Sequence, residues 1–229
     1  MRLDFFVANS TGLSRKASRQ QISQGEVTVD NEVCRKAATH LHPGQVVCWR
    51  QQTLALPGER YYMLNKPTGV VSATRDRDHT TALDLLPADL RPGLHVAGRL
   101  DIDTTGLLLL TSDGDWSHRI TSPRHQCLKR YRVTLAEPLD DAARQHLEQG
   151  VLLRNDPEPT QAARVETVSE KLIDLTISEG RYHQVKRMLA AVGNRVDALH
   201  RLQIGPVSLD PTLEAGTFRA LTKDEIGAF

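Results

Sequence analysis

Residues 98–106, with the sequence Gly-Arg-Leu-Asp-Ile-Asp-Thr-Thr-Gly, gather side chains that are suited to chemistry. The segment places Arg99 and two carboxylates, those of Asp101 and Asp103, beside two threonine hydroxyls. The apolar run Leu107–Leu110 follows directly. This order predicts a polar loop that leads into a buried strand, with the acids held at the start of that strand. Loops carried on rigid elements are common sites of catalysis.

Two other interpretations of this loop are open. Asp101, Asp103 and Thr105 satisfy the Asp-x-Asp-x-Thr pattern of magnesium-dependent aspartyl-phosphate phosphatases, in which one aspartate attacks phosphorus and the other is the acid. That motif should follow directly on a buried strand, but Gly98 and Arg99 interrupt the preceding segment, and single motifs have a high false-positive rate. Alternatively, the two aspartates cap a turn or pair with Arg99, because Asp-rich turns are common.

Length and composition narrow the class of protein. The 229 residues suffice for one large domain or two smaller ones. No apolar run approaches the ~20 residues that a membrane helix needs, and the N-terminus lacks the plan of a signal peptide. The three cysteines are far apart, which disfavours a disulfide framework or a thiolate metal site and fits a reducing cytoplasm. The net charge is only +1, so any RNA-binding surface must be a local cluster of basic residues.

Residues 1–59 are predicted to form a small separate domain, joined by a polar linker around Pro57-Gly58 to a second domain over residues 60–229. The small domain should contain a helix that Gly12 ends, a second helix from Ser14 to Gly25, and a hairpin that turns at Asp30-Asn31. The second helix has no acid between Ser10 and Gly25, which favours a phosphate-binding face over a plain solvated one. Its basic residues are Arg15, Lys16 and Arg19.

The second domain should open with a strand, a Pro-Gly turn and another strand over residues 61–71, and a strand at 129–135 should bury Tyr131 on its apolar face. Further expected elements are a short helix ending near Pro87, helices at 115–120 and 140–150, a strand at 173–177, and one or two strands near residues 204–207. A last helix, after Gly180, carries an apolar stripe that Lys186 flanks. Lys186 can thus reach an enclosed cleft, whereas Arg187 lies nearly opposite and should face solvent or RNA.

Several spaced motifs resemble known RNA-modifying proteins. Near the N-terminus, Arg2-Leu3-Asp4, Ser14-Arg15 and residues 25–30 are similar to the S4 RNA-binding module. The second domain resembles the RsuA branch of the pseudouridine synthases, and most closely its small-subunit (16S) ribosomal RNA members. The motifs that carry this resemblance occur in order: Asn65-Lys66-Pro67-x-Gly69, the Gly-Arg-Leu-Asp of residues 98–101, Thr121–His125, Lys129-Arg130-Tyr131 and Gly180–Arg187.

The resemblance implies an α+β fold with a mixed, mainly antiparallel sheet, and an enzyme that turns uridine into pseudouridine with one essential aspartate, which falls on Asp101. A carboxylate can stabilise positive charge on the ribose, add covalently or remove a proton, and the sequence does not choose among these routes. The family's basic residue falls on Lys186 and would keep that carboxylate ionised. The family's tyrosine falls on Tyr131, whose ring can stack on an everted uracil.

The implied partner is small-subunit ribosomal RNA, either naked or as an assembling ribonucleoprotein, in the cytoplasm. The family needs no cofactor and no metal, and a monomer without membrane contact is the default. Arg99 would fill the gap left by the flipped base or hold a phosphate. The competing function is that of a non-catalytic RNA-binding or ribosome assembly protein. The expected RNA-binding residues are Arg15, Lys16, Arg19, Arg99, Arg124, Arg181 and Arg187.

Overall fold

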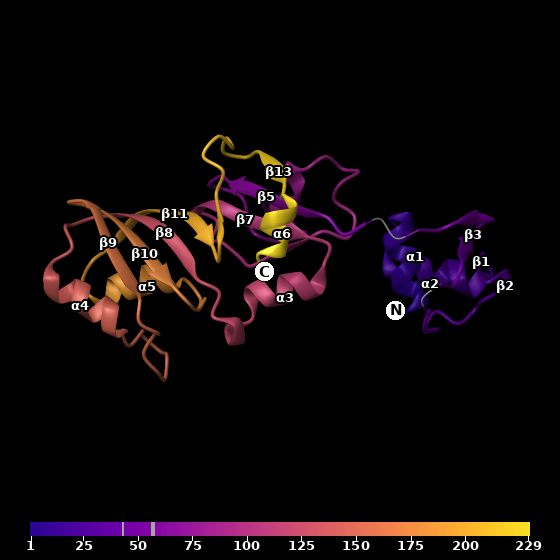
Figure 1. The fold of residues 1–229 in the computed structure, drawn as a ribbon, viewed down its shortest axis with the longest axis horizontal. Coiled ribbons are helices and arrows are strands. Elements are labelled where there is room, and N and C mark those ends of the chain that lie inside the picture. The colour runs from indigo at the N-terminus through magenta and orange to yellow at the C-terminus, as the bar shows by residue number, and fades with distance from the viewer. Residues whose placement is uncertain (43, 56–57) are drawn as a thin grey trace. The chain divides into compact units, whose positions relative to one another are not determined.

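The computed structural model of the protein describes residues 1–42, 44–55 and 58–229 (Figure 1). The chain folds as two compact units, Met1–Glu59 and Arg60–Phe229. The linker expected at Pro57-Gly58 falls in part outside the described residues, since Pro57 is not among them. Within the described ranges, no helix has the length and apolar character needed to cross a membrane.

The first unit packs two helices against a small antiparallel sheet. Helices α1 (Leu3–Thr11) and α2 (Arg15–Gln24) precede strands β1 (Val27–Val29), β2 (Glu32–Val33), β3 (Val47–Trp49) and β4 (Gln52–Thr53), in the sheet order β2-β1-β3-β4. The expected helix boundaries are confirmed, because the Ser14 hydroxyl accepts from the Ala17 amide and Gly25 ends α2 at a φ of 84°. The predicted hairpin is confirmed as well: Asp30 and Asn31 form its turn at positive φ.

A larger sheet organises the second unit. Its main path among the described residues runs β13-β5-β7-β11-β8-β10-β9, and β6 and β12 pair with β7 and β11. All of these pairs are antiparallel except β7 with β11, which confirms the mixed, mainly antiparallel sheet. The strands are β5 (Tyr61–Lys66), β6 (His95–Ala97), β7 (Thr105–Thr111), β8 (Lys129–Leu135), β9 (Arg164–Ser169), β10 (Leu172–Ile177), β11 (Val196–Ile204), β12 (Val207–Ser208) and β13 (Phe218–Ala220).

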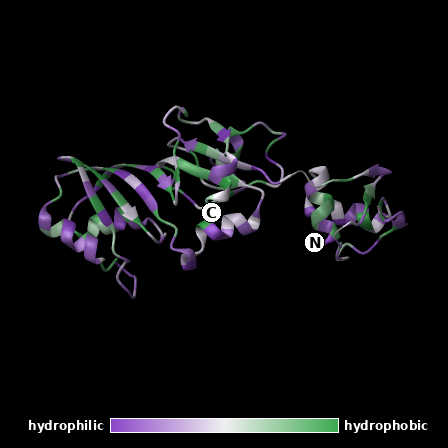
Figure 2. Cartoon of the chain, viewed as in Figure 1, coloured by the Kyte–Doolittle hydropathy of each residue, from purple (hydrophilic) through white to green (hydrophobic). Residues whose placement is uncertain are grey.

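Strand β7 lies inside the sheet between β5 and β11, it is buried from Gly106 to Thr111, and Figure 2 shows it as hydrophobic along most of its length. Leu108 and Leu110 pack into one hydrophobic cluster, and Leu107 and Leu109 pack into another with Trp116. A strand that is covered on both sides reads as a continuous apolar run instead of an alternating one. The loop that precedes β7 is therefore anchored to the most buried strand of the domain.

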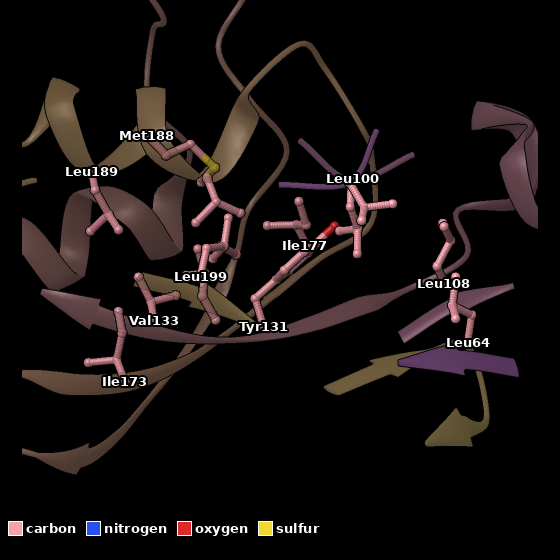
Figure 3. Packing of buried hydrophobic residues seen from close by; sticks show 14 of the residues in the cluster. Leu64, Leu100, Leu108, Tyr131, Val133, Ile173, Ile177, Met188, Leu189 and Leu199 are labelled. Atoms are coloured by element: carbon pink, nitrogen blue, oxygen red, sulfur yellow. The ribbon is translucent and has the colours of Figure 1, made fainter. Parts of the chain in front are cut away.

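Short helices and loops cover the sheet. The helical elements are η1 (Ala82–Leu85), α3 (Gly114–Thr121), η2 (Pro123–His125), α4 (Asp141–Gln149), α5 (Gln184–Ala191) and α6 (Lys223–Gly227). Helix α5 contributes Val185, Met188 and Leu189 to the cluster that also holds Tyr131 and Val133 of β8, as Figure 3 shows in part. This packing fixes the helix against the sheet, so that its first turn is held in a defined position.

One expectation about strands was wrong. The strand predicted after the Pro-Gly turn does not form, because Val71 makes only an isolated bridge to Thr81. The expectation of one or two strands near residues 204–207 is confirmed, since β11 ends at Ile204 and β12 begins at Val207, although β11 starts as far back as Val196. Near the start of β11, Asp197 and Ala198 are both exposed, so this part of the strand lacks the apolar alternation that identifies a half-buried strand.

Candidate active site

The loop that carries Asp101 is held by hydrogen bonds at several consecutive backbone carbonyls. Ser72 is buried, and its hydroxyl donates to the Leu100 carbonyl and accepts from the Leu100 amide at 2.8 and 3.0 Å. The Thr104 amide donates to the Asp101 carbonyl at 3.1 Å, and the Gly69 amide donates to the carbonyl of Ile102 at 2.8 Å. These bonds pin the loop to the turn after β5, so the Asp101 side chain projects from rigid backbone.

Lys66, the last residue of β5, lies fully buried behind this loop. Its ammonium donates to the carbonyls of Pro67 at 2.8 Å and Ile102 at 3.4 Å. Burial lowers the pKa of Lys66 to about 8, although the charges of Asp103 and Asp101 oppose that shift. The site therefore contains a buried cation close to both carboxylates, on the side away from solvent.

A second lysine joins the two aspartates from helix α5. The Nζ atom of Lys186 lies 3.2 Å from an Asp101 carboxylate oxygen and 2.6 Å from an Asp103 carboxylate oxygen. Burial alone would lower the pKa of Lys186, but its bonds to Asp103 and Asp101 raise it above its usual value. The same contact lowers the pKa of Asp103. Lys186 is thus held as a cation against Asp101, whose side chain is 28% exposed.

The turn before α5 brings a third group to Asp101. His183 adopts a left-handed conformation, with φ of 47°, and its Nε2 atom lies 3.4 Å from the other carboxylate oxygen of Asp101. The ring of Tyr182 stacks on the His183 ring at 3.8 Å between centroids, and Tyr182 itself is exposed. The buried amide of Gln184 fixes this turn, since it accepts from the Arg181 backbone amide and donates to Glu179.

Tyr131 lies deeper in the same site. It is 9% exposed, and Figure 3 shows it within the hydrophobic cluster that also holds Leu100, Ile177 and Leu199. The guanidinium of Arg201, on the neighbouring strand β11, donates to the Tyr131 hydroxyl at 3.4 Å. The tyrosine therefore presents an aromatic ring in an apolar setting and a hydroxyl that a buried cation holds.

A cavity of about 790 Å³ in the second unit is lined by most of these residues, His183 and Arg201 among them. Its lining includes Asp101, Tyr131 and Lys186, which the sequence placed in the site, together with Arg99 and Arg181. This volume lies within the range of roughly 300–1,000 Å³ that small-molecule sites occupy. The cavity can accept a single nucleotide and present it to a carboxylate, a cation and an aromatic ring.

The other basic residues predicted from the sequence lie in different surroundings. Arg99 and Arg124 are exposed, Arg99 as part of the cavity lining and Arg124 in η2. Arg187 does not simply face solvent, as its position on the helix suggested, because its guanidinium lies 2.6 Å from Asp156. Arg181 pairs with the same aspartate at 3.2 Å.

In the first unit, Asp4 organises the basic face. Its carboxylate is fully buried and lies 3.2 Å from Arg15, 2.8 Å from Arg19 and 3.1 Å from Arg2. Burial raises the pKa of Asp4, but bonds from Arg19, Arg2 and Arg15 outweigh it and bring the pKa to about 2. Lys16 is exposed beside this cluster. The three guanidinium groups are half-exposed. The carboxylate that they share holds each of them in place instead of leaving it to move freely.

Sequence reasoning gave no role to Lys66, His183 or Arg201. Lys66 and His183 each fall within a motif that carries the family resemblance, and their place in those motifs was a usable signal. Arg201 carried no such signal, because a single arginine in an unassigned segment does not indicate that it is buried. Its position depends on the pairing of β11 with both β7 and β8, which only the tertiary fold reveals.

Comparison with known proteins shows which family the chain belongs to. Residues 60–191 match the family described as RNA pseudouridylate synthase, and residues 1–47 match the S4 domain. Ribosomal small subunit pseudouridine synthase A of Escherichia coli (strain K12) is 51% identical over 229 residues, which are 100% of this chain and 99% of that protein. The protein of the same name from Vibrio cholerae serotype O1 is 48% identical over 228 residues, again 100% and 99% of the two chains.

A solved structure supports the same relationship. The crystal structure of a pseudouridylate synthase superimposes with a TM-score of 0.74 and 44% identity, and the match covers 100% of this chain and 99% of the other. The match to the family spans more than half of the sequence and includes Asp101, Tyr131 and Lys186. Together with full-length relatives near half identity, it establishes that this chain belongs to the RNA pseudouridylate synthase family.

Proposed function

We propose that this protein isomerises one uridine of small-subunit ribosomal RNA to pseudouridine, in the cytoplasm. The observation that carries the proposal is the Asp101 carboxylate, held between Lys186 and His183 at the wall of a nucleotide-sized cavity. The choice of RNA is supported by the full-length similarity to enzymes named for the small ribosomal subunit. The S4 match supports RNA as the partner of the first unit.

In this proposal, Asp101 is the catalytic carboxylate. Cleavage of the bond between ribose C1′ and uracil N1 develops positive charge on the sugar, which a nearby carboxylate stabilises or traps covalently. Lys186 keeps the carboxylate charged in a partly closed site, and the Tyr131 ring stacks on the everted base. No water is consumed, because the detached uracil turns and is joined again through C5.

The target uridine must leave its stack to reach Asp101, which costs a few kcal/mol. Contacts between basic residues and RNA phosphates offset that cost. We assign this role to Arg99, Arg124, Arg181 and Arg187 in the second unit and to Arg15, Lys16 and Arg19 in the first. The competing function, a non-catalytic assembly protein, gives no reason for a lysine that bridges two aspartates inside a cavity.

The test is to incubate the purified protein with transcripts of small-subunit and large-subunit ribosomal RNA and to map pseudouridine by chemical labelling and primer extension. We expect a single modified uridine in the small-subunit transcript and none in the large-subunit control. A small-subunit particle assembled from purified components serves as a second substrate. Absence of pseudouridine in both the transcript and the particle would contradict the proposal, and modification of the large-subunit transcript alone would contradict the choice of RNA.

A further inference from the structure

Arg201 is a buried cation that has no carboxylate partner among the residues that the structure describes. The residue is only 3% exposed. It lies on β11, where it pairs directly with Tyr131 on β8. Among the described residues, its guanidinium bonds only to neutral oxygens: the carbonyls of Leu107 and Arg99 and the Tyr131 hydroxyl. A buried charge normally has an opposite charge beside it, because desolvation is otherwise costly.

One end of this guanidinium makes no hydrogen bond to any of the described residues. The Nε atom donates to Leu107 at 2.8 Å, and Nη1 donates to Arg99 at 3.2 Å and to Tyr131 at 3.4 Å. The Nη2 atom is buried and has no partner within the part of the chain that the structure describes. A buried donor left unpaired costs about 1–3 kcal/mol. Such a group in a native fold calls for a specific explanation.

The location of Arg201 supplies that explanation. The residue lines the same cavity as Asp101 and Tyr131. Its guanidinium is anchored at two points of the site. One is the backbone carbonyl of Arg99, two residues before Asp101, and the other is the Tyr131 hydroxyl. Much of the surrounding surface is apolar, with Leu100 and Ile204 in the cavity wall. In such a setting, a fixed cation interacts strongly with charge that develops on a bound ligand.

We propose that Arg201 contacts the substrate: its free Nη2 group binds a carbonyl oxygen of the everted uracil and stabilises the negative charge on that ring. This inference rests on the proposed isomerisation. When the C1′–N1 bond breaks, its electron pair stays with uracil and is shared by N1 and the two carbonyl oxygens. After rotation, C5 forms the new bond to C1′, the C5 proton leaves and N1 gains a proton. Atoms and electrons therefore balance without any added reagent.

A uracil carbonyl fits the position of Arg201 better than an RNA phosphate does. A phosphate carries a solvated charge and remains near the cavity mouth, where Arg99 is exposed. Arg201 is almost completely buried beside the ring on which the base is proposed to stack. The absence of a carboxylate partner, among the described residues, leaves the guanidinium charge available for the leaving uracil anion.

The experiment combines variants of Arg201 with atom-substituted RNA. The RNA fragment that contains the mapped target is made with uridine, 2-thiouridine or 4-thiouridine at that position, because sulfur accepts hydrogen bonds weakly. Single-turnover rates are measured for the wild type, Arg201→Met and Arg201→Lys. Arg132→Met is the matched control, since Arg132 lies on β8 on the face opposite Tyr131 and pairs with Asp174.

We expect Arg201→Met to lower the rate with uridine about 100-fold, as loss of one oxyanion donor does, with little change in RNA affinity. One of the two substrates, 2-thiouridine or 4-thiouridine RNA, should react about tenfold more slowly than uridine RNA with the wild type and with the Arg132→Met control. The rate of Arg201→Met should be the same with that substrate as with uridine RNA. If Arg201→Met does not fold, Arg201→Lys, which keeps the charge but loses the planar fork, gives the same comparison. Wild-type modification of the uridine RNA tests the proposed function separately. The assignment would be overturned if the sulfur substitution slowed the Arg201 variants by the same factor as the wild type.

Discussion

The Nζ atom of Lys186 lies 3.2 Å from the Asp101 carboxylate, although 85 positions separate the two residues in the sequence. The pair joins the first turn of α5 to the loop before β7. The pKa of Lys186 is raised by its carboxylate partners, so the contribution of this charge to stability is complete below the unfolded pKa of the lysine, which is 10.5. The contribution is lost only as the pH rises through the higher folded value, so the ion pair is intact at neutral pH.

Replacing Lys186 by methionine should therefore reduce catalysis more than folding. We expect kcat to fall about 100-fold or more, because Asp101 loses the cation that stabilises its charge. Lys186→Arg should keep part of the activity. The control is Lys223→Met, which removes the same charge from the exposed surface of α6. Equal activity of Lys186→Met and the control in a pseudouridine assay would contradict this role.

Lys66 should give the protein a distinct pH dependence of stability. Its folded pKa of about 8 lies below the usual 10.5, so the unfolded chain binds the extra proton between these two values. Stability therefore rises with pH across this window as the cost of the buried charge disappears. For this group we expect a gain of about 2 kcal/mol between pH 7.5 and pH 9.5.

The measurement is urea unfolding of the wild type and Lys66→Met at the two pH values. The wild type should gain about 2 kcal/mol more than the variant on going from pH 7.5 to pH 9.5. Comparison with the variant removes the contributions of other groups that titrate in the same range. Identical pH dependence of the two proteins would show that Lys66 is not a buried charge in the folded state.

Asp4 should increase RNA affinity although its charge is negative. Its carboxylate fixes Arg2, Arg15 and Arg19 on one face, so Asp4→Asn should loosen that face and weaken RNA binding several-fold despite the added positive charge. Glu32→Gln, on the exposed strand β2, makes the same charge change without touching the cluster. Filter binding to the ribosomal RNA fragment at several salt concentrations measures both. Tighter binding by Asp4→Asn would show that net charge alone governs this surface.

Gly106 is required where β7 meets β11. Its φ is 100°, and a β-carbon there would lie 2.7 Å from the backbone nitrogen of Arg201. Gly106→Ala should thus separate the parallel pair and lower the free energy of unfolding by at least 2 kcal/mol, with loss of activity. Gly114→Ala is the control, since a β-carbon at Gly114 meets nothing within 4 Å. Thermal melting of the two variants compares them directly, and equal stability would contradict the close approach.

Local patterns in the sequence predicted the parts of the fold that depend on neighbouring residues. Ser14 and Gly25 bound α2 as expected, and strand β8 buries Tyr131 while its alternate residues are only partly buried. The apolar stripe of α5 placed Lys186 at the edge of the core, where the structure brings it to Asp101. These features follow from periodicity and capping, which act over a few residues.

The features that were missed depend on pairing between distant segments. The burial of Lys66 requires the acidic loop to fold over the end of β5. Arg201 is buried because β11 pairs in parallel with β7 and antiparallel with β8, and nothing near Arg201 in the sequence indicates either partner. The contact between Arg187 and Asp156 was missed for the same reason, because it joins α5 to a loop 31 positions away.

The central claim, that the Asp101 carboxylate carries out the isomerisation, is tested most directly by Asp101→Asn, which keeps the size of the side chain and removes its charge. The measurement is pseudouridine formation in the small-subunit transcript, together with RNA affinity and the melting temperature of the variant. We expect unchanged affinity, a native melting temperature and no detectable pseudouridine, while Asp103→Asn keeps measurable activity. Pseudouridine formation by Asp101→Asn at the wild-type rate would contradict the account.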